Sequence, residues 1–170
     1  MLSEGNDKHP RAIAITSDEL FSSAEQDIAS GNGARGIRTL RDLANRGHVA
    51  AQHNLAYLYD TGVGVRRNIG FALNWYRRAY RSGSGIAATN MAICYRDLER
   101  FDLALSWFKR AAARGDADAH VEIAKLYLRS AGGWRRAQPH LQKALSAPGT
   151  RISRDARREA RSLFRQLSIR

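Results

Sequence analysis

The sequence has few cysteines, few lysines and no long hydrophobic run, and each shortage excludes a class of protein. One of its 170 residues is a cysteine, so neither an internal disulfide framework nor a CxxC metal motif can form. That residue, Cys94, stands between Ile93 and Tyr95 in a repeated segment, with no partnered histidine at a recognisable spacing. We therefore expect a small buried hydrophobic side chain rather than a nucleophile.

No stretch of the chain is apolar over the length that a membrane span requires. The first ten residues, MLSEGNDKHP, also lack the apolar segment of a secretory signal. With 44% hydrophobic and 26% charged residues, the composition is that of a soluble chain long enough for one domain with a real core. We expect a cytoplasmic protein without a membrane partner.

Acidic residues are also scarce, and the net charge is +12. The charge rises along the chain, from −2 over residues 1–60 to +5 over 61–128 and +9 over 129–170. Only four of the 28 basic residues are lysines, so nearly all of the positive charge is arginine. The basic C-terminal part predicts an acidic partner, which is either a protein surface or a nucleic acid.

A pattern of polar, aliphatic, alanine and, three residues later, tyrosine occurs three times along the chain. The stretch HNLAYLYDTGVGV begins at residue 53, and the matching stretch TNMAICYRDLERF begins at residue 89. A third copy follows 32 residues after the second. The aligned residues are Asn54, Leu55, Ala56 and Tyr59, then Asn90, Met91, Ala92 and Tyr95, then Glu122, Ile123, Ala124 and Tyr127.

Each copy is followed by a second matching segment: ALNWYRRA (72–79), ALSWFKRA (104–111) or AQPHLQKA (137–144). Their apolar residues recur at the i, i+3, i+4 and i+7 spacing of one helix face. In the third segment we expect Pro139 to lie in the first helical turn, where its missing N–H does no harm. Upstream, Ser17 or Asp18 is expected to cap a helix that opens a more degenerate first unit.

Four helix–loop–helix units are therefore predicted, at 18–47, 48–83, 84–115 and 116–146. A single helical hairpin cannot bury its apolar face, so the units must stack into an all-α, right-handed solenoid. Residues 147–170 form a basic amphipathic helix that caps the last unit, with alanine and leucine on one face and arginine on the other. We expect residues 1–17 to be a flexible lead-in to the repeats.

The stretch NLAYLYDTGVGVRRNIGFALNWYRRAYRSG (54–83) resembles a Sel-one-like repeat, a relative of the tetratricopeptide class. The next unit lacks four loop residues, and its second helix resembles an ordinary tetratricopeptide helix equally well. The resemblance implies a scaffold that binds peptides or protein surfaces on its concave side without catalysis. Bacterial members include adaptors, signalling regulators, secretion-linked factors and immunity proteins that neutralise toxins. The residues that carry the resemblance are Leu55, Ala56, Tyr59, Gly62, Gly64, Val65, Ala72, Trp75, Tyr76, Ala79 and Gly83.

The resemblance also places candidate binding residues on the concave side of the first helices. In related modules an asparagine at the place of Asn54 and Asn90 grips a peptide backbone or a carboxylate. The alternative is that these are solvated helix positions without a ligand. The candidates on this side are His53, Asn54, Tyr57, Thr89, Asn90, Arg96, Glu122 and Lys125.

Further candidates outside the concave side are one tryptophan and several arginines. Trp134 stands beside Arg135, a composition typical of binding hot spots and of base stacking, unless Trp134 instead staples the next helix. Arg157 and Arg161 belong to the arginine stripe of the last helix, which suits bidentate binding of carboxylates or phosphates. We interpret two further basic pairs as solvated positions on the convex side: Arg77–Arg78 and Lys109–Arg110.

No catalytic constellation is recognisable, so we expect neither an enzyme nor a bound cofactor. The five histidines make no metal-ligand spacing, and the glycine-rich stretches lack the features of a phosphate loop. Asp116 and Asp118 flank a turn and are predicted to cap the next helix. The sequence thus favours a protein-interaction scaffold for an acidic partner, of which an immunity protein is a special case. The alternative is a nucleic-acid-binding protein that uses its arginine-rich C-terminal region.

Overall fold

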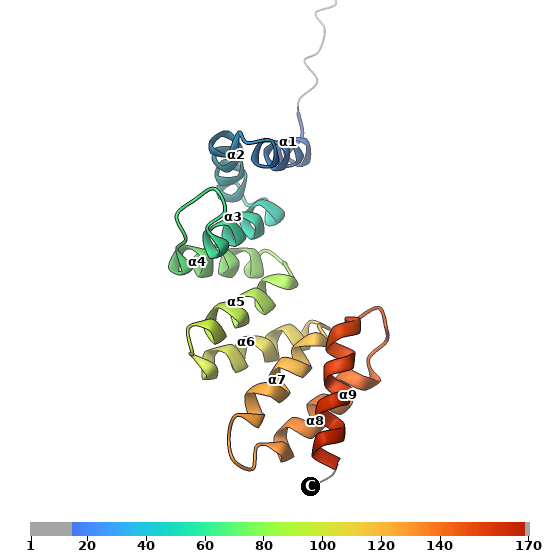
Figure 1. Cartoon of the computed structure of the whole chain (residues 1–170). Helices are drawn as coiled ribbons and strands as arrows, with labels where there is room; N and C mark the ends of the chain where they lie inside the picture. The colour runs from blue at the N-terminus through green and yellow to red at the C-terminus, as the bar shows by residue number, and fades with distance from the viewer. Residues whose placement is uncertain (1–14, 169–170) are drawn as a thin grey trace, which may run out of the picture.

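The computed structural model describes residues 15–168 and shows an α-solenoid, which confirms the fold class expected from the repeats (Figure 1). Within these residues nine helices follow one another in sequential antiparallel pairs, and no strand is formed. Residues 1–14 of the predicted lead-in and residues 169–170 of the predicted capping segment lie outside this description. The helices are α1 (Ser17–Ala29), α2 (Gly33–Asn45), α3 (Val49–Thr61), α4 (Ile69–Arg81), α5 (Ile86–Asp97), α6 (Phe101–Ala113), α7 (Asp118–Leu128), α8 (Trp134–Ser146) and α9 (Arg154–Ser168).

Each helix packs on the helices before and after it, and α9 packs on both α8 and α7. In Figure 1 the pairs stack in chain order from α1 to α8, and α9 lies beside α7 and α8 at the C-terminal end. Contacts are thus mainly between neighbouring units, as expected for a solenoid.

Polar side chains fix where several helices begin. The α1 N-cap is Thr16, whose hydroxyl accepts a hydrogen bond from the Glu19 N–H while the Glu19 carboxylate accepts one from the Thr16 N–H. The prediction of Ser17 or Asp18 as the cap was therefore wrong, because this reciprocal pair requires a Glu three residues after the cap. Asn68 caps α4 by accepting a hydrogen bond from the Phe71 N–H, at 3.0 Å.

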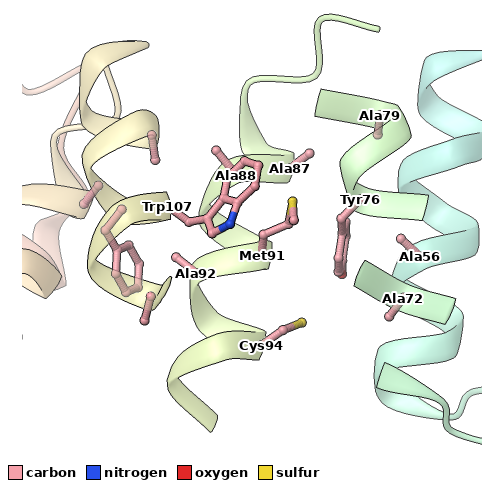
Figure 2. Close-up of a cluster of buried hydrophobic side chains, with 14 of the residues drawn as sticks. Ala56, Ala72, Tyr76, Ala79, Ala87, Ala88, Met91, Ala92, Cys94 and Trp107 are labelled. Carbon is pink, nitrogen blue, oxygen red and sulfur yellow. The ribbon is translucent and has the colours of Figure 1, made fainter. Parts of the chain in front are cut away.

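The core runs through the stack as three adjoining clusters of buried side chains. In the central cluster Met91 of α5 lies between Tyr76 of α4 and Trp107 of α6 (Figure 2). Fully buried alanines, among them Ala56 and Ala92 of the repeated motif, leave room for the helices to approach one another. Each unit therefore supplies part of the core of the next.

The prediction for Pro139 was wrong. The helix α8 begins at Trp134, five residues earlier, so the proline lies inside the helix rather than in its first turn. Its ring removes the N–H that would otherwise bond to the carbonyl of Arg135. Both residues are exposed, so water can satisfy that carbonyl.

The apolar face of α9 packs on the C-terminal cluster, as its amphipathic pattern indicated. Ala160 is fully buried, and Leu163 and Phe164 pack beside it. Ile152, in the connection before the helix, is 5% exposed and belongs to the same cluster. The helix thus covers apolar surface that α7 and α8 would otherwise expose.

Candidate partner-binding surfaces

Seven of the eight residues predicted on the concave side use their polar groups to connect neighbouring units. Asn54 of α3 donates a 2.8 Å hydrogen bond to Glu25 of α1. Asn90 of α5 in turn lies 2.9 Å from Nε2 of His53 on α3. Thr89 donates to the carboxylate of Asp116, which also accepts from the Asp118 and Ala119 N–H groups at the start of α7, as predicted for Asp116. The prediction that Asp118 caps the same helix was wrong, because Asp118 is its first residue and accepts from the Ser153 N–H instead. The seven residues are His53, Asn54, Thr89, Asn90, Arg96, Glu122 and Lys125.

The same ladder continues through charged groups to α9. Arg96 of α5 forms a 2.9 Å ion pair with Glu122 of α7, and Lys125 bridges Glu122 and Glu159 of α9 at 2.9 and 3.0 Å. Partial burial alone would lower the pKa of Lys125, but its hydrogen bonds to both glutamates outweigh burial and raise the pKa. The ammonium group is therefore held in its charged form between two units.

A ligand on this side must compete with bonds that already exist. Burial lowers the pKa of His53, so the imidazole stays neutral and accepts the Asn90 hydrogen bond. These side chains are consequently neither free ligand-binding groups nor isolated solvated positions. Their role in binding a partner remains a prediction.

Tyr57, the eighth candidate, is 51% exposed and lines a hollow between α1, α2 and α3. The hollow has a volume of about 340 Å³, and Ile28, Leu40, Leu58 and Val63 also line it. This hollow therefore offers apolar surface on the predicted concave side.

Charge is segregated by helix rather than only along the chain. We call α1, α3, α5 and α7 the odd row and α2, α4, α6 and α8 the even row. The odd row carries eight acidic and two basic residues, whereas the even row carries two acidic and eleven basic residues. Within the described chain the even row forms one ion pair, Arg35 with Asp27 at 3.3 Å. The even row is thus a positively charged surface with little internal compensation.

Arginines of the even row lie over aromatic rings. In α4 the guanidinium of Arg78 lies 4.4 Å from the ring centroid of Trp75, and in α6 Arg110 lies 4.3 Å from that of Trp107. Arg114, just after α6, covers Tyr80 at 3.8 Å and donates to the carbonyl groups of Tyr80 and Ser84. These stacks hold planar hydrogen-bond donors in fixed orientations.

Trp134 and Arg135 begin α8 and are both exposed. Trp134 is 40% exposed, and the guanidinium of Arg135 lies 5.3 Å from its ring centroid. Gly133, which precedes them, is buried, and a side chain there would overlap the carbonyl of Tyr127. The turn therefore fixes the tryptophan at the surface at the start of the helix.

The two α9 arginines chosen from the sequence differ in their surroundings. Arg161 is exposed, but Arg157 is half-buried and donates a hydrogen bond to the Ala147 carbonyl, which anchors the connection between α8 and α9. Periodicity could not reveal this, because the acceptor is in the irregular segment before the helix. The exposed arginines of the helix are Arg154, Arg158, Arg161 and Arg165.

The structure brings together His120 and His140, a pair that no sequence pattern indicated. Their Nδ1 atoms lie 3.0 Å apart between α7 and α8. Burial and nearby lysines disfavour the charged form of each histidine, and His120 also disfavours that of His140, which lowers the pKa of both and brings that of His140 to about 4. Their separation of 20 residues matches no familiar motif, so a structure was needed to find the pair.

Cys94 is buried, as expected, and its thiol donates to Oδ2 of Asp60 at 3.5 Å. Burial and that carboxylate raise the pKa of the thiol to about 12, so the reactive thiolate is not populated near neutral pH. Among residues 15–168 no three metal-binding side chains gather. In the same range no helix has the length and hydrophobicity needed to cross a membrane.

Stacked helical hairpins with a continuous core define a helical-repeat scaffold of the tetratricopeptide class. The Sel1 repeat family model matches residues 49–84 and 85–116. The chain is also 24% identical over 90 residues to a sel1-like repeat-containing protein of Acanthamoeba polyphaga mimivirus. That match covers 53% of this chain and 17% of the viral protein, so this chain spans a small part of the length of the viral protein. Two Sel1 repeats therefore occupy residues 49–84 and 85–116 of the chain.

Solved structures agree with this fold. A Sel1 repeat protein from Oxalobacter formigenes matches with a TM-score of 0.69 at 21% identity, over 89% of this chain and 63% of that one. A protective antigen of uropathogenic Escherichia coli that displays an SLR fold matches with a TM-score of 0.62 at 19% identity, over 90% of this chain and 45% of that one. At these identities the likeness concerns the fold alone.

Proposed function

We propose that the protein is a non-catalytic scaffold that holds an acidic protein partner on its basic C-terminal part, α8 and α9. One observation carries the proposal. The outer face of α9 presents four exposed arginines, and among the described residues one of them, Arg158, has an acidic partner. That partner, Asp155, is itself highly exposed, and the pair is 3.6 Å apart, so it contributes little.

Arginine in this arrangement suits an interface. Its guanidinium is weakly hydrated, stays charged and forms paired hydrogen bonds with carboxylates. An uncompensated basic face also attracts an acidic partner before contact, which raises the association rate. Trp134 and Arg135, exposed at the start of α8, add the aromatic and arginine types that are enriched in binding hot spots.

Affinity capture from a nuclease-treated lysate of the source cells, followed by mass spectrometry, tests the proposal. The tagged protein is compared with an Arg158→Glu/Arg161→Glu variant, which leaves the structural Arg157 intact. We expect a stoichiometric protein partner on the unaltered protein and loss of most of that partner on the variant. Circular dichroism serves as the folding control, because both side chains point to solvent.

The other outcomes are equally informative. If the partner is a toxin, the protein is its immunity protein, the more specific form of this proposal. If nothing co-purifies from the nuclease-treated lysate, but nucleic acid co-purifies from an untreated lysate, the protein binds nucleic acid and the proposal is wrong. The expected cytoplasmic location remains a separate prediction, which fractionation of the source cells tests.

A further inference from the structure

The even row contains the same tryptophan–arginine arrangement in two consecutive units. Trp75 and Arg78 in α4, and Trp107 and Arg110 in α6, have the same three-residue spacing and lie 32 residues apart in the sequence. Their guanidinium-to-ring distances, 4.4 and 4.3 Å, are nearly identical. The corresponding residues of α8 are His140 and Lys143, which do not form this stack, so within the described chain the arrangement is limited to two units.

The two stacks belong to one continuous patch. The ring of Tyr80, near the end of α4, meets Trp107 edge to face at a centroid distance of 5.2 Å and joins the aromatic layers of the two units. Both arginines are exposed, and neither forms an ion pair with a described residue. The contact of Arg78 with Asn45, at 3.5 Å, is long and neutral. Two fixed guanidinium groups therefore face solvent without a carboxylate.

We propose that Arg78 and Arg110 form a two-arginine clamp that binds two carboxylates of an acidic segment of a protein partner lying across α4 and α6. This inference rests on the proposed scaffold function and assigns it a second surface. Stacking on a ring fixes the guanidinium plane and leaves its N–H edge outward, where it presents the parallel donors that match the two oxygens of a carboxylate. Because the stacks exist in the unbound protein, less side-chain freedom is lost on binding.

A protein segment fits this patch better than a nucleic acid does. Single-stranded nucleic acids bind mainly by stacking bases on open aromatic faces. Here the rings are covered by the arginines, and Trp107 is only 9% exposed. The acidic residues of the scaffold are concentrated in the odd row, so the patch is left without a competing carboxylate. The interpretation of Arg78 and Arg110 as merely solvated positions is replaced by this proposal.

A titration with defined probes tests the clamp. The probe is a fluorescein-labelled peptide of alternating glutamate and serine, and the matching glutamine–serine peptide is the control. Anisotropy is measured with the full chain and with Arg78→Gln/Arg110→Gln. We expect the double variant to bind the acidic peptide at least about tenfold more weakly, since each lost charge-assisted pair weakens binding by roughly that factor. The glutamine peptide should bind neither protein measurably.

Two matched variants separate the clamp from net charge. Arg38→Gln/Arg81→Gln removes the same charge from exposed positions of α2 and α4 that stack on no ring, and it should weaken binding by less than about twofold. Arg78→Lys/Arg110→Lys keeps the charge but loses the planar donors. Its affinity for the acidic peptide should therefore lie between that of the unaltered protein and that of Arg78→Gln/Arg110→Gln. Equal weakening by both glutamine variants, or full affinity of the lysine variant, would overturn the clamp.

A labelled single-stranded oligonucleotide is titrated in parallel. Tighter binding of the oligonucleotide than of the acidic peptide, lost in Arg78→Gln/Arg110→Gln, would also overturn the proposal in favour of nucleic acid. These results are distinguishable from failure of the proposed function. Lysate capture can yield a partner whose binding requires the α9 arginines, while peptide binding is unchanged by loss of Arg78 and Arg110. In that case the proposed scaffold function is supported and the clamp is refuted.

Discussion

Gly36 is a residue at which α1 and α2 approach each other closely. A β-carbon built on this glycine would lie 2.5 Å from the Ala24 carbonyl oxygen and 2.7 Å from Cγ1 of Ile28. Real β-carbons do not approach backbone oxygens so closely, so any side chain must push the two helices apart. The residue is therefore required by packing rather than by a turn.

Replacing Gly36 with alanine is expected to destabilise the N-terminal pair by about 1–3 kcal/mol, although alanine favours helix. Chemical denaturation followed by circular dichroism measures the change. Gly33→Ala is the matched control, because a β-carbon there meets nothing within 4 Å, and it should change stability by less than about 1 kcal/mol. A Gly36→Ala protein as stable as the control would refute this account of the helix contact.

The role of a residue could be predicted where it depends on neighbours in the sequence, and could not where it depends on residues far away along the chain. The burial of Cys94 and the capping role of Asp116 follow from adjacent sequence. The crowding at Gly36 depends on the crossing of two helices, and the anchoring of Arg157 depends on the path of an irregular segment. Neither leaves a periodic signal.

At the scale of helices, the contact between α7 and α8 contains a pH-sensitive pair. The rings of His120 and His140 face each other at a centroid distance of 5.2 Å, with Tyr127 beside His140. Lys143 and Lys109 disfavour a positive charge there, while Asp116 partly offsets this for His120. The folded protein therefore holds both imidazoles neutral under conditions in which the unfolded chain begins to protonate them.

Stability should decline as the pH falls from about 6.5 toward 4. Both histidines have lower pKa values in the folded state, so acid favours the unfolded chain, whose histidines take up protons near pH 6.5. His140→Gln keeps a hydrogen-bonding side chain that does not titrate. Between pH 7 and pH 5 the thermal unfolding midpoint should fall by about 2–4 °C more in the unaltered protein than in this variant. Parallel curves for the two proteins would contradict the assignment.

Helices and their pairing could be predicted because each carries an apolar stripe at the helical period. The bonds between successive odd-row helices could not, because they join residues such as Asn54 and Glu25, 29 positions apart. Which side chains meet at that separation depends on the rotation between units, which the period of a single helix does not encode.

At the scale of the whole molecule, acidic and basic helices that alternate along the chain lie in separate rows of the solenoid. First helices carry most of the acidic residues and second helices most of the basic ones, so stacking produces rows of opposite charge. Summing charge over successive parts of the chain finds the basic C-terminal region but not the rows. That separation becomes visible once each residue is assigned to an odd or an even helix.

The odd row and the even row differ in how their charges are used. Charges of the odd row pair across units, as Arg96 does with Glu122, and so hold the stack together. Those of the even row and of α9 are mostly left without acidic neighbours among the described residues. The scaffold account therefore predicts an acidic partner on the even row and on the exposed arginines of α9, which take no part in the bonds between odd-row helices.

Arginine footprinting of the complex tests this account most directly. The protein is treated with phenylglyoxal, alone and saturated with the partner captured from lysate, and modified arginines are quantified by mass spectrometry. We predict that the partner protects Arg78, Arg110, Arg158 and Arg161, while Arg35 and Arg38 of α2 react equally in both samples. Protection confined to Arg96, or no protected arginine, would contradict a partner held on the arginine surfaces.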